Sequence, residues 1–128
     1  MSIKVLPPME HTFSIEEKGS ETGQPYAGTF TYKRPSLRVR TEINKTAAIL
    51  DGGVVTLDEE TKYLHTVFAR LKHTLSNVPD WWEKSDYGFE LYDLNVVLAI
   101  YKATKEFDKE WEQKVLGIED KSDKKSKK

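Results

Sequence analysis

The first third of the chain alternates apolar and polar positions. In segment 11–17, Phe13 and Ile15 are separated and flanked by polar residues, and in segment 26–35 one side of the alternation consists of Tyr26, Gly28, Phe30 and Tyr32. A period of two predicts strands with one buried face. Because residues 18–25 between them are rich in turn formers, we predict an antiparallel hairpin over about 11–34. An isolated hairpin is marginal in water, so it must pack on another layer.

After residue 35 the apolar spacing becomes three and four, which predicts three amphipathic helices. The first, about 36–50, ends before Gly52 and Gly53, which suit a left-handed C-cap. The second, about 57–78, follows the capping-box sequence TLDE at 56–59 and stops before a proline. The third covers about 93–115. The apolar stripes comprise Val39, Ile43, Ala47 and Leu50, then Leu64, Val67, Phe68, Leu71, Leu75 and Val78, and finally Leu94, Val97, Leu98, Tyr101, Phe107, Trp111 and Val115.

These elements predict an α+β fold in which an N-terminal antiparallel β-hairpin packs on a bundle of about three helices. The 128 residues suit one domain, which we place at 1–116. Segment 117–128 carries five lysines against Glu119, Asp120 and Asp123. Its charge and low complexity predict a disordered, Lys-rich tail.

The charge balance and the missing cysteines narrow the function classes. The 20 Lys and Arg residues nearly cancel the 21 Asp and Glu residues, for a net charge of −1, so we expect no specific nucleic-acid partner. The absence of cysteine excludes disulfides, thiol catalysis and thiolate metal sites, and is typical of a reducing cytosol. No apolar run approaches the roughly 20 residues of a membrane span, so we expect no membrane partner.

Residues with catalytic or metal-binding chemistry are scattered. His65 and His73 are eight residues apart, about 12 Å along a helix, too far to share a metal ion, and we predict that they are solvated. Nucleotide-binding and zinc-protease motifs are missing. We therefore predict a non-enzymatic protein without catalytic residues, cofactor or metal. The acids predicted to lie on the outer face of the third helix are Asp108, Glu110 and Glu112.

An aromatic cluster follows the second helix. Trp81 and Trp82 are adjacent, and neighbouring side chains diverge by about 100° in a helix and about 180° in a strand. The pair therefore predicts a corner, in which either both rings are wedged between packed elements or one is core and the other is offered to a partner. We favour one ring buried between the second and third helices and the other partly exposed. With Tyr87, Phe89 and Tyr92 the pair forms a group typical both of binding surfaces and of cores.

The basic segment KRPSLRVR contains Arg34, Arg38 and Arg40. If the segment is helical, Arg34 and Arg38 share a face and can bind a phosphate or the carboxylates of a partner. The alternative, which we favour, pairs these arginines with the neighbouring acids.

The order of motifs along the chain resembles a known group of proteins. A hairpin ending in GTFTYKRPSL, a helix closing on AAILDGG, the helix start LDEET, the corner VPDWW and the helix LYDLNVVLAIYKATKEFDKEW follow one another over about 26–111. This order resembles the tail assembly chaperone-like small proteins encoded in the tail modules of long-tailed bacteriophages. The resemblance implies a factor in the host cell cytoplasm that binds the tape measure protein, keeps it soluble and promotes polymerisation of tail-tube subunits around it.

The resemblance supplies no catalytic residues but suggests a contact surface. On this hypothesis the aromatic residues brace or form the surface, while the arginines meet acids on the client or on another copy of this chain; the residues are Trp81, Trp82, Tyr87, Phe89, Arg34, Arg38 and Arg40. One alternative is a structural virion protein of the phage tail or neck, whose strand GTFTYKR joins a neighbour's sheet. Another is a small inhibitor directed at the host.

Overall fold

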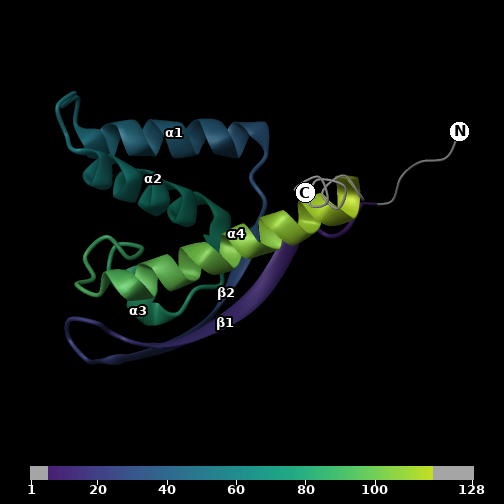
Figure 1. Cartoon of the computed structure of the whole chain (residues 1–128), viewed down its shortest axis with the longest axis horizontal. Coiled ribbons are helices and arrows are strands. Elements are labelled where there is room, and N and C mark those ends of the chain that lie inside the picture. Colours follow the sequence, from purple (N-terminus) through teal and green to yellow (C-terminus); the bar gives the residue numbers. More distant parts are fainter. Residues whose placement is uncertain (1–5, 117–128) are drawn as a thin grey trace, which may run out of the picture.

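Among the residues that the structure describes, a three-stranded antiparallel sheet is combined with four helices, of which the first lies on the second, away from the sheet (Figure 1). The structure, a computed structural model, describes residues 6–116. The α+β class with an N-terminal hairpin is confirmed, whereas the disorder predicted for 117–128 lies outside the described residues. The elements are β1 (Glu10–Lys18), β2 (Pro25–Lys33), α1 (Leu37–Asp51), α2 (Glu59–Thr74), β3 (Leu75–Ser76), α3 (Asp80–Lys84) and α4 (Leu94–Leu116).

The hairpin β1–β2 follows the alternating pattern of the sequence. Phe13 pairs with Phe30 and Ile15 with Gly28, so the apolar positions of both strands share the face that the helices cover. The polar Thr12 pairs with Thr31 on the other face, where their hydroxyl groups are 3.1 Å apart. The strand order β1-β2-β3 leaves β1 at one edge of the sheet.

Helix α1 begins and ends at local signals. The Ser36 hydroxyl accepts a hydrogen bond from the backbone N–H of Val39, and Gly52 closes the helix in the left-handed conformation with φ 62°. This confirms the predicted glycine C-cap. Of the residues in α1, only Ile43 is buried, while Val39, Ala47 and Leu50 are half-buried.

Helix α2 differs from the prediction at both ends. Its N-cap is Asp58, which accepts from the Thr61 N–H at 2.7 Å, so the predicted capping box from Thr56 is wrong. The helix stops at Thr74 instead of 78, because Leu75 and Ser76 leave it to pair with β2. The strand edge offers these residues backbone partners that replace those of a further helical turn.

The chain after β3 continues beside β2 and forms the predicted corner. Pro79 lies over Gly28, where an added Cβ would be 2.5 Å from the proline Cγ. The half-buried Trp81 packs on Tyr26, with ring centroids 5.0 Å apart, and donates from its indole N–H to the Ala27 carbonyl at 3.0 Å.

Trp82 completes the corner in the interior. It is fully buried and meets Phe30 edge to face at 5.7 Å. The division into one buried and one partly exposed tryptophan is therefore confirmed. The central core consists of Phe30, Val67, Leu71, Trp82, Val96, Val97 and Ile100.

A buried carboxylate fixes the hairpin turn to the start of α4. Asp93 has no exposed surface and accepts from the backbone N–H groups of Glu21 and Thr22, at 2.7 and 2.8 Å, and from the hydroxyl groups of Thr22 and Tyr26. The Thr22 hydroxyl is the largest cause of the lowered pKa of Asp93. Hydrogen bonds to the charged form favour ionisation, which outweighs the effect of burial here.

This arrangement predicts a particular acid sensitivity. The pKa of Asp93 is lower in the folded chain than the roughly 3.9 of an unfolded aspartate, so its contribution to stability is complete above about pH 4 and is lost as pH falls through the folded pKa. Asp93→Asn should therefore flatten the acid limb of the unfolding free energy, measured by urea titration between about pH 3 and 7. Asp80→Asn, at an exposed position, is the control. Acid limbs of equal slope in the Asp93 variant and the native chain would contradict this role.

Candidate functional site

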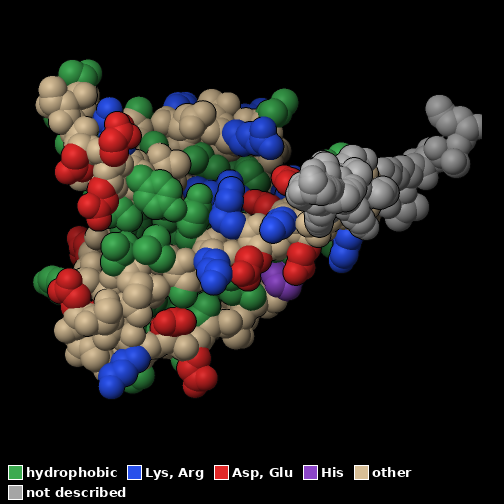
Figure 2. All heavy atoms as spheres, viewed as in Figure 1, with side chains coloured by type: hydrophobic (Ala, Val, Ile, Leu, Met, Phe, Trp, Pro, Cys, Tyr) green, Lys and Arg blue, Asp and Glu red, His purple; other side chains and the backbone are tan. Residues whose placement is uncertain are grey.

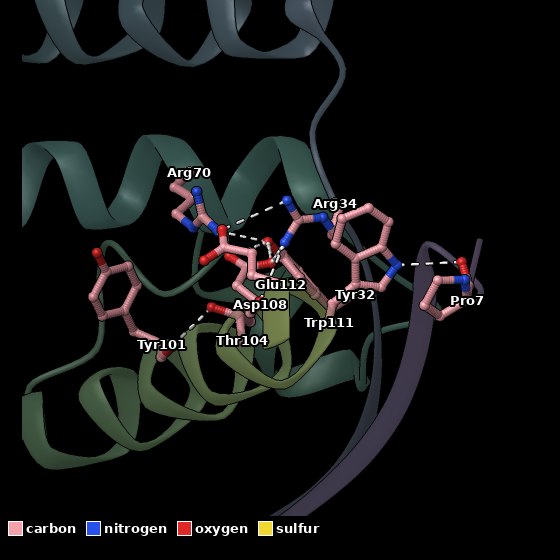
Figure 3. Close-up of polar contacts among 9 residues, drawn as sticks. All are labelled: Pro7, Tyr32, Arg34, Arg70, Tyr101, Thr104, Asp108, Trp111 and Glu112. Atoms are coloured by element: carbon pink, nitrogen blue, oxygen red, sulfur yellow. Dashed lines mark hydrogen bonds and ion pairs between the residues drawn. The ribbon is translucent and has the colours of Figure 1, made fainter. Parts of the chain in front are cut away.

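Asp108 is the centre of a polar network between β2, α2 and α4 (Figure 3). The Tyr32 hydroxyl donates to both carboxylate oxygens, at 2.8 and 2.9 Å. Arg70 of α2 donates from Nη2 to the carboxylate and to the Tyr32 hydroxyl oxygen. The three elements are thus joined at one carboxylate, whose side chain is only 13% exposed.

Arg34, in the segment that connects β2 to α1, binds the same carboxylate. Its Nη1 lies 3.0 Å from Asp108 Oδ1, and its Nη2 lies 3.7 Å from Glu112 Oε2. The guanidinium group stacks on Trp111, 4.1 Å from the ring centroid, and the Trp111 indole donates to the Pro7 carbonyl at 3.2 Å. Figure 3 shows that Arg34 and Arg70 approach Asp108 from different elements. Two arginines therefore share one largely buried counter-charge.

Tyr32 and Tyr101 are held in their neutral forms. Burial raises the pKa of Tyr32, and burial together with the neighbouring Tyr63 raises the pKa of Tyr101. Both phenols therefore act as hydrogen-bond donors and as apolar ring surfaces at ordinary pH. Neither is activated as a base or nucleophile by these surroundings.

An open groove lies above this network, between α1, α2 and α4. It has a volume of about 410 Å³ and an apolar part formed mainly by Pro35, Ile43 and Tyr101. Figure 2 shows Lys and Arg side chains near α4 beside an area of apolar side chains. We call it the α1–α2–α4 groove; its residues are Arg34, Pro35, Arg40, Ile43, Asn44, Thr66, Arg70, Tyr101, Lys105, Asp108 and Glu112.

The three arginines of the basic segment have different surroundings. Among the described residues, Arg34 forms its ion pairs with Asp108 and Glu112, which are distant in sequence, and not with the neighbouring acids that we expected. Arg40 is exposed and lines the groove, whereas Arg38 is exposed on α1 and does not line it. Neither Arg38 nor Arg40 forms an ion pair with another residue of segment 6–116.

The predicted aromatic residues lie on the other side of α2. Tyr87 and Phe89 line a separate pocket of about 90 Å³ with Phe68 and Lys72, while Arg70 faces the groove. Residues two apart on a helix point to nearly opposite sides. The structure therefore does not bring the aromatic and arginine groups into one site. Trp81 and Trp82 pack against β2, and the role of all these residues in partner binding stays a prediction.

The prediction of solvated histidines is wrong. The His65 side chain is only 12% exposed and its Nδ1 lies 2.6 Å from Asp51 Oδ1. His73 Nε2 lies 2.7 Å from the Thr46 hydroxyl oxygen. Because Asp51 and Thr46 belong to α1, these two histidines connect α2 to α1 instead of facing water.

The placement of Asp108 on an outer helix face is also wrong, and Tyr32 and Arg70 were not expected to form a site. The sequence does contain a signal for the positions of Asp108 and Arg70. Asp108 is spaced by four from Thr104 and by three from Trp111, which puts a carboxylate on the buried stripe of α4. Arg70 occupies the same kind of position on α2, beside Leu71 and before Thr74. Charged residues at matching stripe positions of two helices indicate a buried pair.

Over residues 6–116, no three His, Asp or Glu side chains are grouped so as to hold a metal ion. In the same part of the chain no helix combines the length and apolar composition that crossing a membrane requires.

The fold and the groove define a small α+β domain with an open, mixed cationic and apolar surface over a largely buried charge network. No protein-family model matches the chain, and no curated protein or solved structure compared with it is significantly similar.

Proposed function

We propose that this chain is a non-enzymatic binding protein that acts in the assembly of phage tails. Its client is the tape measure protein, which it keeps soluble in the host cell cytoplasm while tail-tube subunits polymerise around it. The resemblance of the motif order suggests the client, and the groove suggests how the client is bound. A long amphipathic helix aggregates through its apolar stripe unless another surface covers it.

The observation that carries the proposal is the α1–α2–α4 groove. Its walls are helices, its lining combines Ile43 and Tyr101 with cations, and Tyr63, which contacts Tyr101, is 50% exposed beside it. Helix-in-groove recognition uses apolar side chains one helical turn apart, with charges that fix the orientation. A groove of this composition suits one face of such a helix.

Co-expression with the tape measure protein tests this function. Asn44 is exposed and lines the groove, so Asn44→Trp should fill it without disturbing the core. We expect the native chain to raise the soluble fraction of the tape measure protein and the variant to lose most of that effect. Ile49→Trp, at a 75% exposed position of α1 outside the groove lining, is the matched control. Equal solubility with and without the native chain would reject the proposal.

The second candidate, a structural protein of the tail or neck, is favoured by one observation. In the described part of the chain no strand pairs with the outer edge of β1, which is nine residues long. The edge of β2 that was expected to join a neighbour is instead occupied by β3 at Thr31 and Tyr32. Mass spectrometry separates the two functions: an assembly factor is present in lysates of assembling cells but absent from mature virions, whereas a subunit keeps a fixed copy number in the particle.

A further inference from the structure

The α1–α2–α4 groove carries an excess of positive charge. Its four cations, Arg34, Arg40, Arg70 and Lys105, face two carboxylates, those of Asp108 and Glu112. The whole chain has a net charge of −1, so the groove is cationic against a nearly neutral background. Such a local field attracts anionic groups and orients them before contact.

Two of the four cations, Arg40 and Lys105, are not paired with a carboxylate of residues 6–116. Arg34 and Arg70 are held by Asp108, with side chains only 16% exposed. Arg40 and Lys105 are exposed and form no ion pair with any other residue between 6 and 116; Lys105 only lies 5.9 Å from the centre of the Tyr101 ring. Arg40 belongs to α1 and Lys105 to α4, so these cations belong to different helices that line the groove.

We infer that this groove binds an acidic segment of a protein partner, with its carboxylates held between Arg40 and Lys105 and its apolar side chains against Ile43 and Tyr101. The inference rests on the proposed function and specifies which part of the client is bound. Carboxylates suit the guanidinium and ammonium donors, and the apolar lining suits a peptide better than a sugar-phosphate chain. The chain's own segment 117–128 is an unsuitable occupant, because its lysines outnumber its acids.

Peptide binding tests the inference directly. The probe is a fluorescein-labelled amphipathic helical peptide of about 18 residues, or five turns, with leucines on one face and glutamates beside them. Its partner probe has glutamine at every glutamate position. Fluorescence anisotropy with the full chain should show about tenfold tighter binding of the glutamate peptide, and this preference should shrink between about 0.05 and 0.3 M salt.

Matched variants locate the site. Arg40→Gln combined with Lys105→Gln should remove the preference for glutamate, whereas Arg38→Gln combined with Lys102→Gln removes the same charge at exposed positions outside the groove lining and should keep it. Circular dichroism verifies that both variants fold. If both variants lose the preference for the glutamate peptide equally, the preference arises from general charge attraction, and the inference is overturned. Equal affinity of the native chain for both peptides would also overturn it. Tighter binding of an oligothymidylate of similar length would overturn it too, because the groove would then be a nucleic-acid site.

Two further results separate this inference from the proposed function. If the glutamate preference is found but the tape measure protein is not solubilised, the acidic-segment site stands and the client is another protein. If the tape measure protein is solubilised while both peptides bind equally, the proposed function stands and the inference fails. Concentration-dependent self-association that the Arg40 and Lys105 variant abolishes would identify the occupant as another copy of the chain and would overturn the inference.

Discussion

Trp82→Ala is expected to destabilise the fold by about 3–5 kcal/mol, because the ring is fully buried and its removal leaves a cavity between β2, α2 and α4. Small domains are stable by only about 5–15 kcal/mol, so the variant should be largely unfolded at moderate urea concentrations. The surroundings cannot close easily over the gap. Gly88 packs its backbone directly on the Trp82 ring with φ 88°, a conformation that suits glycine.

Two comparisons make this prediction specific. Trp81→Ala should cost less, because that ring is half-buried, although it also removes the hydrogen bond to Ala27. Trp82→Phe should also cost less than Trp82→Ala, since it keeps an aromatic ring and removes an indole N–H that has no acceptor among the described residues. Urea unfolding followed by circular dichroism measures all three. Equal losses for Trp81→Ala and Trp82→Ala would contradict the assignment of Trp82 as the core residue of the pair.

The second large effect is expected at Asp108. Asp108→Ala removes the counter-charge of Arg34 and Arg70, whose side chains are only 16% exposed. Removal of one partner of a buried ion pair typically costs about 3–5 kcal/mol, because the remaining charge has lost its compensation. The Tyr32 hydroxyl loses its acceptor at the same time.

Glu112→Ala is the matched control for this effect. Glu112 also pairs with Arg34, but its side chain is 56% exposed, so its loss should change the free energy of unfolding by no more than about 1 kcal/mol. Further replacement of Arg34 and Arg70 by Met in the Asp108→Ala background should recover part of the stability, because no buried charge is then left unpaired. If Asp108→Ala lowered the free energy of unfolding no more than Glu112→Ala does, the network would contribute little to the stability of the fold.

The hairpin and the limits of α1 could be predicted because their signals are local. Alternation along 26–35 sets the buried face of β2, and Ser36 and Gly52 mark the ends of α1 by their own hydrogen bonds and dihedral angles. The end of α2 could not be predicted in this way. Leu75 continues the helical stripe, but it leaves the helix for an edge of β2 that only the folded sheet creates.

The candidate site depended even more on long-range contacts. Arg70 and Asp108 are 38 residues apart, and Arg34 and Asp108 are 74 apart, so no local window contains the network. From spacing alone, the acids of α4 are interpreted as a solvated row, because nearby lysines in the sequence can be assigned to them as ion-pair partners. The aromatic and arginine groups do not form a single site for a related reason: α2 separates the pocket of Tyr87 and Phe89 from the groove.

The two walls of the groove, α1 and α4, are held in place in different ways. Polar contacts from His65, His73 and Arg34 hold α1 and the segment before it in place, while Ile43 is the only residue of α1 that is buried. The opposite wall, α4, is fixed by Val96, Val97 and Ile100 in the core. Because the central core contains no residue of α1, outward displacement of this helix would leave that core intact; under the proposed function, it would let the groove fit successive stretches of a long partner whose side chains differ in size. A groove with two rigid walls would accept only one such stretch.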